Sequence, residues 1–451
     1  MVRAKRASPV EITEAVLDRI GKKNPSLNAF VALDAEGARA AARAAEAAVM
    51  KGEGLGPLHG VPVSIKDVQA VKGLPTRRGS CLSDATPAAE DAVLVARLRA
   101  AGAIILGKTT ATEHGWTAVS SSPLTGHTHN PWKQGRTAGG SSSGAAALCG
   151  AGCGPLHLGT DGAGSIRLPA HFCGVVGFKP TYGRVPYTPV PNNGGLSHAG
   201  PLARTAEDAA LMFSVMAGPS PRDHTSLPDT FPATIAPGGL KGLRIAYSRD
   251  LGHARVDPDV AAVVEASLAA LVAAGAVVEQ VTPPWGPEGP ALEREMWGGA
   301  YKAFLAKSPQ EEARMDPGLV ACTEAFRGYS FEQAHAAMGR RFAYAAAVNS
   351  WFSEAGYDLL ATPSASVAAF DVGRQLPEHW PQHDWDWLVW AEFSYPFDLS
   401  HGPAVSVPCG LSAEGLPVGL QLAGPRLADA LVLRAAAGFL AAQPFEITPA
   451  L

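Results

Sequence analysis

The chain has 451 residues, of which 47% are hydrophobic and 17% are charged, and its formal net charge is −4. This balance predicts a large buried core and excludes intrinsic disorder. The charge argues against a nucleic-acid or membrane-surface partner, because no long run of Lys or Arg supplies a basic patch. No stretch of 18 apolar residues occurs, and the basic start MVRAKR leads into SPVE, so neither a membrane span nor a signal peptide is expected.

The cysteines and histidines show no metal-binding pattern. The six cysteines include no C-x-x-C pair and are too sparse for a disulfide framework, which favours a reducing cytoplasm. The 13 histidines form no H-E-x-x-H or comparable cluster. We therefore expect no metal and no other cofactor.

Helices and strands alternate along the chain. The capping box SPVE, which begins at Ser8, opens a helix that is expected to stop near Pro25. Periodicity predicts further helices and strands. The helices are expected at 34–50, 88–101 and 428–442, and the strands at 61–66, 103–107, 403–408 and 418–424. Units of a helix followed by a strand are expected over 258–281, where DVAAVVEASLAALVAAG leads into AVVEQV, and over 333–362, ending in DLLATP. This order predicts an α/β fold around one large sheet.

The Pro/Gly-rich segment 216–241 is the best candidate for a domain boundary. Helix–strand units continue on both sides of it, so we predict a single domain over 1–451. Its core would span about 58–200, with an excursion over 216–380 and a return to the core over 400–451.

The segment TAGGSSSGAAA contains a literal G-x-S-x-G motif centred on Ser142. In α/β-hydrolases such a serine follows a buried strand and precedes a helix. Residues 127–138, which come before it, are polar and carry a proline, so they read as a loop. A hydrolase triad would also need a downstream histidine, and nothing singles out His198 or His401. A Ser-His-Asp triad at Ser142 is therefore disfavoured.

A second glycine-rich turn lies in HLGTDGAGSIR (157–167), after a short predicted strand. Glycines allow successive backbone N–H groups to converge on one point, as an oxyanion hole requires. A serine at the end of this turn would lie beside those donors. An ordinary glycine turn is an equal reading at this point, and a phosphate cradle is unsupported because no G-K-[ST] follows.

Lys66 lies in the predicted strand of HGVPVSIKDV, on the same side as Ser64 and Pro62. Lysine is rarely buried, so a lysine in a predicted strand more often lies on an edge strand or at the end of its strand. To act as a base it must be neutral near pH 7, and a pKa lowered from about 10.4 to about 7 corresponds to roughly 4–5 kcal/mol. Burial among apolar neighbours supplies a shift of that order.

These pieces occur together in one family. The chain resembles the amidase-signature hydrolases, which use a Ser–cis-Ser–Lys triad, from residue 8 onward. The matching motifs are GVPVSIKDV, GLPTRRGS, GKTTATEHGW, SPLTGHTHNPW, RTAGGSSSGAAA, GPLHLGTDGAGSIRLPAHFCGVVGFKPTYGRVP and GPAVSVPCG…GLPVGLQLAGP. The resemblance implies a single large α/β domain with a central mixed, twisted β-sheet flanked by helices on both faces.

By this resemblance Ser165 is the nucleophile of an acyl transfer to serine. Ser141, following a cis peptide bond after Gly140, is the bridging serine, and Lys66 is the general base. Ser142 becomes a residue that supports the loop. The backbone N–H groups that would hold the oxyanion are those of Gly162, Ala163, Gly164 and Ser165.

Three features depart from the family pattern. Ser143 and Ala163 each stand where glycine is usual; the added methyl of Ala163 would either narrow the pocket or be tolerated, and we favour tolerance. The chain also begins only seven residues before SPVE, whereas relatives usually carry another helix there. Because that helix often contributes to dimer contacts in the family, the expectation of a homodimer depends on it.

Other residues are candidates for substrate contact or for structure. Arg77 or Arg78 would bind a substrate carboxylate, although a solvated pair is the favoured reading. Four of the nine tryptophans lie within 380–397; they would line an aromatic pocket or pack as core, and Trp116 and Trp387 are the candidate contacts. Scaffold roles are expected for Asp67, Asp161 and Arg167, and solvated loop positions for His114, His127 and His129.

The sequence thus predicts a cofactor-independent amidase that hydrolyses a small carboxamide through an acyl-serine intermediate. An alternative is the amidase subunit of a tRNA-dependent amidotransferase, which would release ammonia from glutamine. A non-catalytic scaffold is disfavoured because all three triad positions are present. The expected partner is a small-molecule amide, with neither nucleic acid nor membrane.

Overall fold

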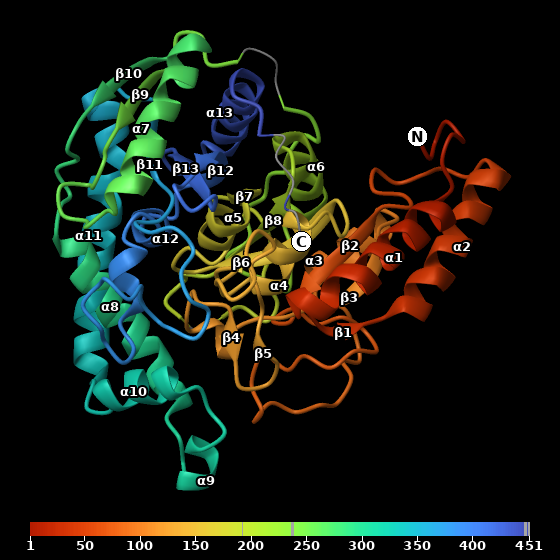
Figure 1. Cartoon of the computed structure of the whole chain (residues 1–451), viewed down its shortest axis with the longest axis horizontal. Helices are drawn as coiled ribbons and strands as arrows, with labels where there is room; N and C mark the ends of the chain where they lie inside the picture. The colour runs from red at the N-terminus through yellow and green to blue at the C-terminus, as the bar shows by residue number, and fades with distance from the viewer. Residues whose placement is uncertain (192, 236–238, 446–448, 450–451) are drawn as a thin grey trace.

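A computed structural model describes residues 1–191, 193–235, 239–445 and 449 (Figure 1). Within them, eleven strands form one sheet in the order β1-β3-β2-β6-β8-β7-β12-β13-β11-β9-β10. These strands are β1 (Phe30–Leu33), β2 (Pro62–Lys66), β3 (Ile104–Thr109), β6 (Leu156–Asp161), β7 (Val176–Lys179), β8 (His198–Ala203), β9 (Arg244–Tyr247), β10 (Val277–Gln280), β11 (Leu359–Pro363), β12 (Ala404–Leu411) and β13 (Pro417–Ala423). A separate short hairpin joins β4 (Ser121–Ser122) to β5 (Gly126–His127).

The helices connect and cover these strands. They are α1 (Pro9–Leu27), α2 (Ala35–Lys51), α3 (Val93–Ala100), α4 (Ser143–Gly150), α5 (Arg167–Cys173), α6 (Ala206–Met216), α7 (Pro258–Ala273), α8 (Glu288–Tyr301), α9 (Pro309–Glu312), α10 (Pro317–Ala325), α11 (Phe331–Ala355), α12 (Tyr395–Leu399) and α13 (Asp429–Ala442). The described residues also form the 3-10 turns η1 (Glu113–Gly115), η2 (Lys302–Phe304) and η3 (Trp387–Trp390). Of the helices in the described part of the chain, none combines the length and apolarity needed to cross a bilayer.

The sheet is mixed, as expected. Strand β2 is parallel to both of its neighbours, β3 and β6. The middle of the sheet, from β6 through β8, β7, β12 and β13 to β11, is antiparallel, and β11, β9 and β10 are again parallel. The carboxyl ends of β2 and β6 therefore lie side by side, and the segments that follow the two strands reach the same site.

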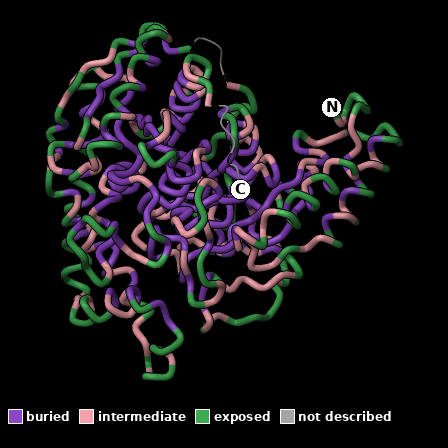
Figure 2. The backbone as a smooth tube through the Cα atoms, viewed as in Figure 1, coloured by how far each residue is buried: buried purple, intermediate pink, exposed green. Residues whose placement is uncertain are grey.

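Helices cover both faces of this sheet, which confirms the predicted layers. Ile105 packs into a core shared with α3, α6, α7 and α13, whereas the adjacent Ile104 packs into a core with α1, α2 and α4. The adjacent Leu359 and Leu360 also pack on opposite faces. Leu359 belongs to the same core as Ile105, and Leu360 belongs to a core with α8, α10 and α11. Successive side chains of a strand point to opposite faces, so each face has its own apolar core. Figure 2 shows this buried centre in purple.

The predicted element boundaries hold with two corrections. Helix α1 continues to Leu27, past Pro25, and ends where Asn28 adopts a left-handed conformation. Residues 88–92 are not helical: Ala88 forms a bridge with Lys72, and the Ala92 N–H donates to the Ala70 carbonyl. Tertiary pairing has replaced the first predicted turns of α3.

The excursion over 216–380 contributes to the same sheet as the rest of the chain. It supplies β9, β10 and β11 at one edge, together with α7 and the group α8, α10 and α11 on the left in Figure 1. The molecule is a single large α/β domain. The finer division into a core at 58–200, the excursion and a return segment at 400–451 stays a prediction.

Candidate active site

Lys66 is the last residue of β2, and its side chain is fully buried. Val63 and Ile65 face the opposite core, so the pleat directs Lys66 to the other side, as predicted. Its Nζ lies 2.7 Å from Ser141 Oγ, 2.8 Å from Thr160 Oγ1 and 3.3 Å from the Thr160 carbonyl oxygen. Burial lowers the pKa of Lys66 to about 7, although the charge of Asp161 acts in the opposite direction.

The serine loop approaches Lys66 immediately before α4. The Gly140–Ser141 peptide bond is cis, as expected from the resemblance. A Cβ at Gly140 would lie 3.0 Å from the Thr117 carbonyl oxygen, so this close approach favours glycine. The Ser142 hydroxyl donates to the Thr160 carbonyl at 3.1 Å and accepts from the Thr160 N–H at 3.2 Å, which ties the loop to β6. Ser142 is thus engaged with the backbone of β6, and in the described residues it makes no hydrogen bond to a histidine.

The turn between β6 and α5 is organised by the buried carboxylate of Asp161. Its oxygens accept from the backbone N–H groups of Gly164 at 2.6 Å, Ile166 at 3.1 Å and Arg167 at 3.4 Å. The Arg167 guanidinium donates to both oxygens at 2.9 Å. Although burial opposes ionisation of Asp161, the charges of Arg167 and Lys179 hold its pKa well below the usual range.

Ser165 ends this turn and lines the same cavity as Ser141 and Gly162. The predicted oxyanion donors need one correction, because the Gly164 N–H is already donated to Asp161. Among the described residues, the N–H groups of Gly162, Ala163 and Ser165 meet no acceptor, so these three remain as candidate donors. Ala163 is buried behind the turn and its carbonyl accepts from the Ser394 hydroxyl at 2.9 Å. Its methyl group therefore does not narrow the cavity, in line with the favoured expectation.

The scaffold residues connect the site to the end of the chain. Arg167 donates to Asp398 at 2.6 Å, to Gln421 at 3.0 Å and to the Ser394 carbonyl at 2.9 Å. Asp67, which follows Lys66, pairs with Lys108 at 2.8 Å in a fully buried position. Both aspartates and Arg167 occupy the structural positions expected of them. Ser143, at the start of α4, has a buried hydroxyl with no hydrogen-bond partner among the described residues.

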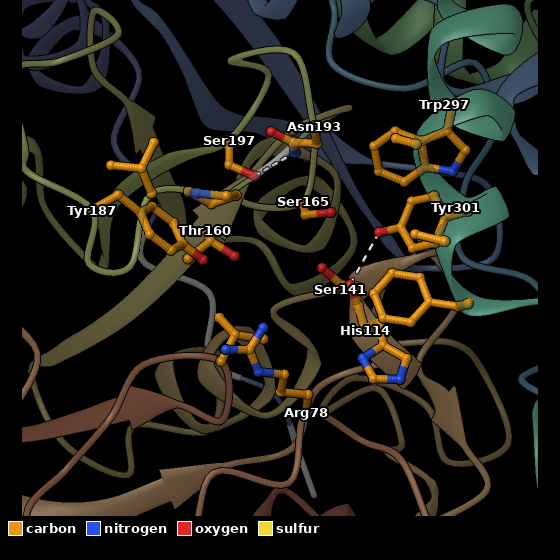
Figure 3. Close-up of a pocket in the computed structure, with 18 of the residues that line it drawn as sticks. Arg78, His114, Ser141, Thr160, Ser165, Tyr187, Asn193, Ser197, Trp297 and Tyr301 are labelled. Carbon is orange, nitrogen blue, oxygen red and sulfur yellow. Dashed lines mark hydrogen bonds between the residues drawn. The ribbon is translucent and has the colours of Figure 1, made fainter. Parts of the chain in front are cut away.

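The cavity above the serines has a volume of about 360 Å³. Figure 3 shows Ser165 near its centre, with Ser141 and Thr160 beside it. One wall is aromatic and comes from the end of α8 and η2: the rings of Trp297 and Tyr301 are 4.9 Å apart, and those of Tyr301 and Phe304 are 5.8 Å apart. Tyr187 lines the opposite side. The cavity thus suits a small substrate with an apolar or aromatic body.

The predicted substrate contacts divide between the cavity and the core. Arg78 lines the cavity, whereas Arg77 does not. The predictions for Trp116 and Trp387 are wrong: both side chains are fully buried outside the cavity lining. Trp387 donates to the Trp116 carbonyl at 2.9 Å and packs edge-on against Trp297. The aromatic cluster at 380–397 is therefore core packing that supports the aromatic wall.

The histidines also differ in part from expectation. His114 is not a solvated loop residue: it lines the cavity, half-buried, and stacks on Phe304 with ring centroids 4.0 Å apart. Burial, together with the charge of Arg78, lowers the pKa of His114 to about 4. His127 is exposed, and the Nδ1 of His198 lies 2.8 Å from the Leu196 carbonyl oxygen, with no hydrogen bond to Ser142 in the described residues. No cluster of His, Cys, Asp or Glu that would hold a metal occurs in the described residues.

Sequence reasoning missed most of the cavity wall. The available signal was the spacing of Trp297, Tyr301 and Phe304, which places three aromatic residues on one side of a helical segment. Nothing local distinguished this group from the tryptophan-rich segment at 380–397. The choice between them depends on how α8 packs onto residues 114–116, where the carbonyl groups of Trp116 and His114 accept from Trp297 and Tyr301.

The chain is similar to known proteins over nearly its whole length. A family model described as Amidase matches residues 11–433. An acylamidase from Rhodococcus erythropolis is 40% identical over 98% of this chain and 94% of its own length. A glutamyl-tRNA(Gln) amidotransferase subunit from Anaeromyxobacter sp. (strain K) is 38% identical over 96% of this chain and 93% of its own length. The crystal structure of a bacterial aryl acylamidase of the amidase signature enzymes matches with a TM-score of 0.91 and 30% identity, over 98% of this chain and 94% of that chain.

Proposed function

The chain belongs to the amidase signature family, and on that premise we propose that it hydrolyses the C–N bond of small carboxamides with Lys66, Ser141 and Ser165 as its catalytic residues. The observation that carries this proposal is the position of Lys66. Its amine is fully buried, and this burial lowers its pKa. Its Nζ lies 2.7 Å from the hydroxyl of Ser141, which lines the cavity.

The surroundings of Lys66 suit a neutral amine. A neutral amine has two N–H bonds and one lone pair. Thr160 offers two acceptors, its hydroxyl oxygen at 2.8 Å and its carbonyl oxygen at 3.3 Å. When both hydrogens are donated to Thr160, the lone pair is left to accept the Ser141 proton. This arrangement makes Lys66 the general base of the site.

In the first half of the reaction Ser165 Oγ attacks the amide carbonyl carbon. Its proton passes to Ser141 as the Ser141 proton passes to Lys66, so one proton is stored on the lysine. The N–H groups of Gly162, Ala163 and Ser165 stabilise the oxygen that becomes negative. Collapse of the tetrahedral intermediate breaks the C–N bond, and the stored proton returns through Ser141 to the departing nitrogen.

In the second half, water attacks the acyl-Ser165 ester. Lys66, again neutral, takes the proton of this water through Ser141, and the collapse of the second intermediate returns a proton to Ser165 Oγ. The products are a carboxylic acid and ammonia or an amine. No cofactor is required for this balance of atoms and charge.

The cavity favours an acyl or aryl amide over free glutamine. Of the described residues that line it, none is Asp or Glu, so nothing there pairs with the α-ammonium group of glutamine. The wall of Trp297, Tyr301 and Phe304 instead suits an apolar group. The role of an amidotransferase subunit is thus the less favoured alternative. A homodimer and a cytoplasmic location stay predictions.

The proposal is tested with a panel of amides and with a fluorophosphonate probe, which labels activated serines. Ser165→Ala is expected to abolish hydrolysis, and Lys66→Ala and Ser141→Ala to reduce kcat by about a thousandfold or more. Ser353→Ala removes an exposed hydroxyl on α11 and serves as the control with unchanged activity. Mass spectrometry should place the adduct on Ser165. Labelling of Ser142, or hydrolysis by Ser165→Ala, would refute the assignment.

A further inference from the structure

The side chain of Arg78 faces the cavity. It lines the cavity wall, and Figure 3 shows its guanidinium turned toward Thr160 and Tyr187. Within the described residues its side chain makes no hydrogen bond and no ion pair. A guanidinium has five N–H donors in a planar fork, which matches the two oxygens of a carboxylate.

The backbone of Arg78 is held in place on both sides. Its N–H donates to the Asp67 carbonyl at 3.1 Å, one residue beyond Lys66, and its carbonyl accepts from the His114 N–H at 2.7 Å. Its φ of 53° lies in the left-handed region, which is uncommon for a residue with a side chain. The side chain thus starts from a fixed point between the general base and the aromatic wall.

The charge of Arg78 is not balanced inside the cavity. The described lining residues include no Asp and no Glu. Two titratable lining residues near it are neutral at pH 7: burial and the charge of Arg78 lower the pKa of His114, and burial raises the pKa of Tyr187 although Arg78 opposes this. Lys66 beneath the serines is close to its midpoint there. Arg78 is therefore the one lining side chain with a full charge at neutral pH among those described.

We propose that Arg78 determines specificity by binding a carboxylate of the substrate, so that the chain prefers amides that combine an apolar or aromatic body with an anionic group. The proposal rests on the proposed amidase function and narrows it to one substrate class. The apolar body packs on Trp297, Tyr301 and Phe304 while the carboxylate accepts two parallel hydrogen bonds from Arg78. Arg77, whose side chain lies outside the cavity, has no part in this contact.

The test compares matched substrates. Adipamate and hexanamide differ in a terminal carboxylate in place of a methyl group on the acyl side, and 4-acetamidobenzoate and acetanilide differ in a carboxylate on the amine side. The wild-type chain is expected to show a higher kcat/KM for the anionic member of at least one pair. Arg78→Gln should lower that anionic-to-neutral ratio about tenfold to a hundredfold, and Arg78→Glu should lower it further. The pair that responds shows on which side of the amide bond the carboxylate binds.

A ratio of two substrates is unaffected by a loss of folded enzyme, so it separates recognition from stability. Arg43→Gln removes the same charge from an exposed position on α2, which supplies no lining residue, and should leave the ratio unchanged. The wild-type preference should also weaken as salt rises, since Arg78 is exposed to solvent.

Two negative outcomes are distinguishable. Hydrolysis of the neutral amides with the same substrate ratio in wild type and Arg78→Gln would overturn the role of Arg78 and leave the amidase function standing. Failure to hydrolyse any of the four amides, together with no probe adduct on Ser165, would overturn the amidase function itself and with it the specificity.

Discussion

Lys66 shows how one side chain can carry the chemistry of a site. A lysine in water is protonated at neutral pH, and a protonated lysine cannot accept a proton from Ser141. The chain lowers this pKa by burying the amine completely, and the charge of Asp161 acts in the opposite direction. The unfavourable free energy of burying the charged form is what makes the amine a usable base.

The pH dependence of activity follows from this pKa. Lys66 must be neutral to take the proton, and its pKa is about 7. The kcat/KM for an uncharged amide should therefore rise with pH, reach half its maximum near pH 7 and stay level above pH 8. Initial rates between pH 5.5 and 9.5 would measure it. A profile that is flat or that falls through pH 7 would contradict the role of Lys66.

The lowered pKa of Lys66 also makes the stability of the folded chain depend on pH. In the unfolded chain Lys66 binds a proton below its ordinary pKa of 10.5, but in the folded chain only below about 7. Folded stability therefore rises between pH 7 and pH 10.5, and below pH 7 the burial of this group costs about 5 kcal/mol.

Lys66→Met removes that cost at similar side-chain length. We expect a gain of about 2–4 kcal/mol in the free energy of unfolding at pH 7, after the lost hydrogen bonds to Thr160 are included. The gain should vanish as the pH approaches 10.5. Urea titrations of both proteins at pH 7 and pH 10 measure the difference. An equal gain at both pH values would show that Lys66 is protonated when buried.

At the scale of single elements, the turn between β6 and α5 determines the geometry around Ser165. One carboxylate, that of Asp161, accepts three backbone N–H groups and two guanidinium bonds. These bonds leave the N–H groups of Gly162, Ala163 and Ser165 without acceptors among the described residues. A buried charge network of this kind is sensitive to the loss of one partner.

Asp161→Asn tests this turn. The amide group has one acceptor oxygen in place of two and presents an NH₂ group to donors, so the buried Arg167 loses its partner on this side. We expect a loss of about 3–5 kcal/mol in unfolding free energy and a large fall in kcat. Asp18→Asn, in an exposed pair with Lys22 on α1, is the matched control and should leave the unfolding midpoint nearly unchanged. An unchanged midpoint for Asp161→Asn would mean that the network contributes little.

At the scale of the whole molecule, two aromatic groups with different roles lie back to back. The indoles of Trp297 and Trp387 both donate to the Trp116 carbonyl at 2.9 Å. Trp297 lines the cavity, and Trp387 packs behind it in the core. Helix α8 and the η3 segment, whose two tryptophans are about 90 residues apart in sequence, thus meet at Trp116, directly after η1.

The core tryptophans and the cavity wall predict different effects for two substitutions, one on stability and one on KM. Trp387→Ala should lower the unfolding free energy by about 3–5 kcal/mol, because it empties a buried site and removes a hydrogen bond. Phe304→Ala, at a ring that is 36% exposed, should leave stability little changed and raise KM for an aryl amide several-fold. Chemical denaturation and steady-state kinetics on both variants measure the unfolding free energy and the KM. A KM effect without a stability effect for Trp387→Ala would place that ring in the cavity.

Local patterns predicted the elements that are long or strongly periodic, such as α1, α2, α7, β12 and β13. They missed β7, β8 and β9, which are short or, in the case of β8, contain Gly200 and Pro201. Those strands form because their neighbours in the sheet supply hydrogen-bond partners. The first turns predicted for α3 were lost for the same reason, since Ala88 pairs with Lys72 instead.

By itself the sequence determined the chemical groups of the site: a lysine in an apolar strand, two serines in glycine-rich turns, and motifs long enough to identify the family. These features are local, because strand alternation and glycine turns are set by residues a few positions apart. Only the tertiary structure decided that Arg78 and not Arg77 faces the cavity, that Gly164 donates to Asp161, and that the aromatic wall comes from α8. The walls of a cavity are assembled from segments brought together by packing, and no short-range pattern records which side chain will point inward.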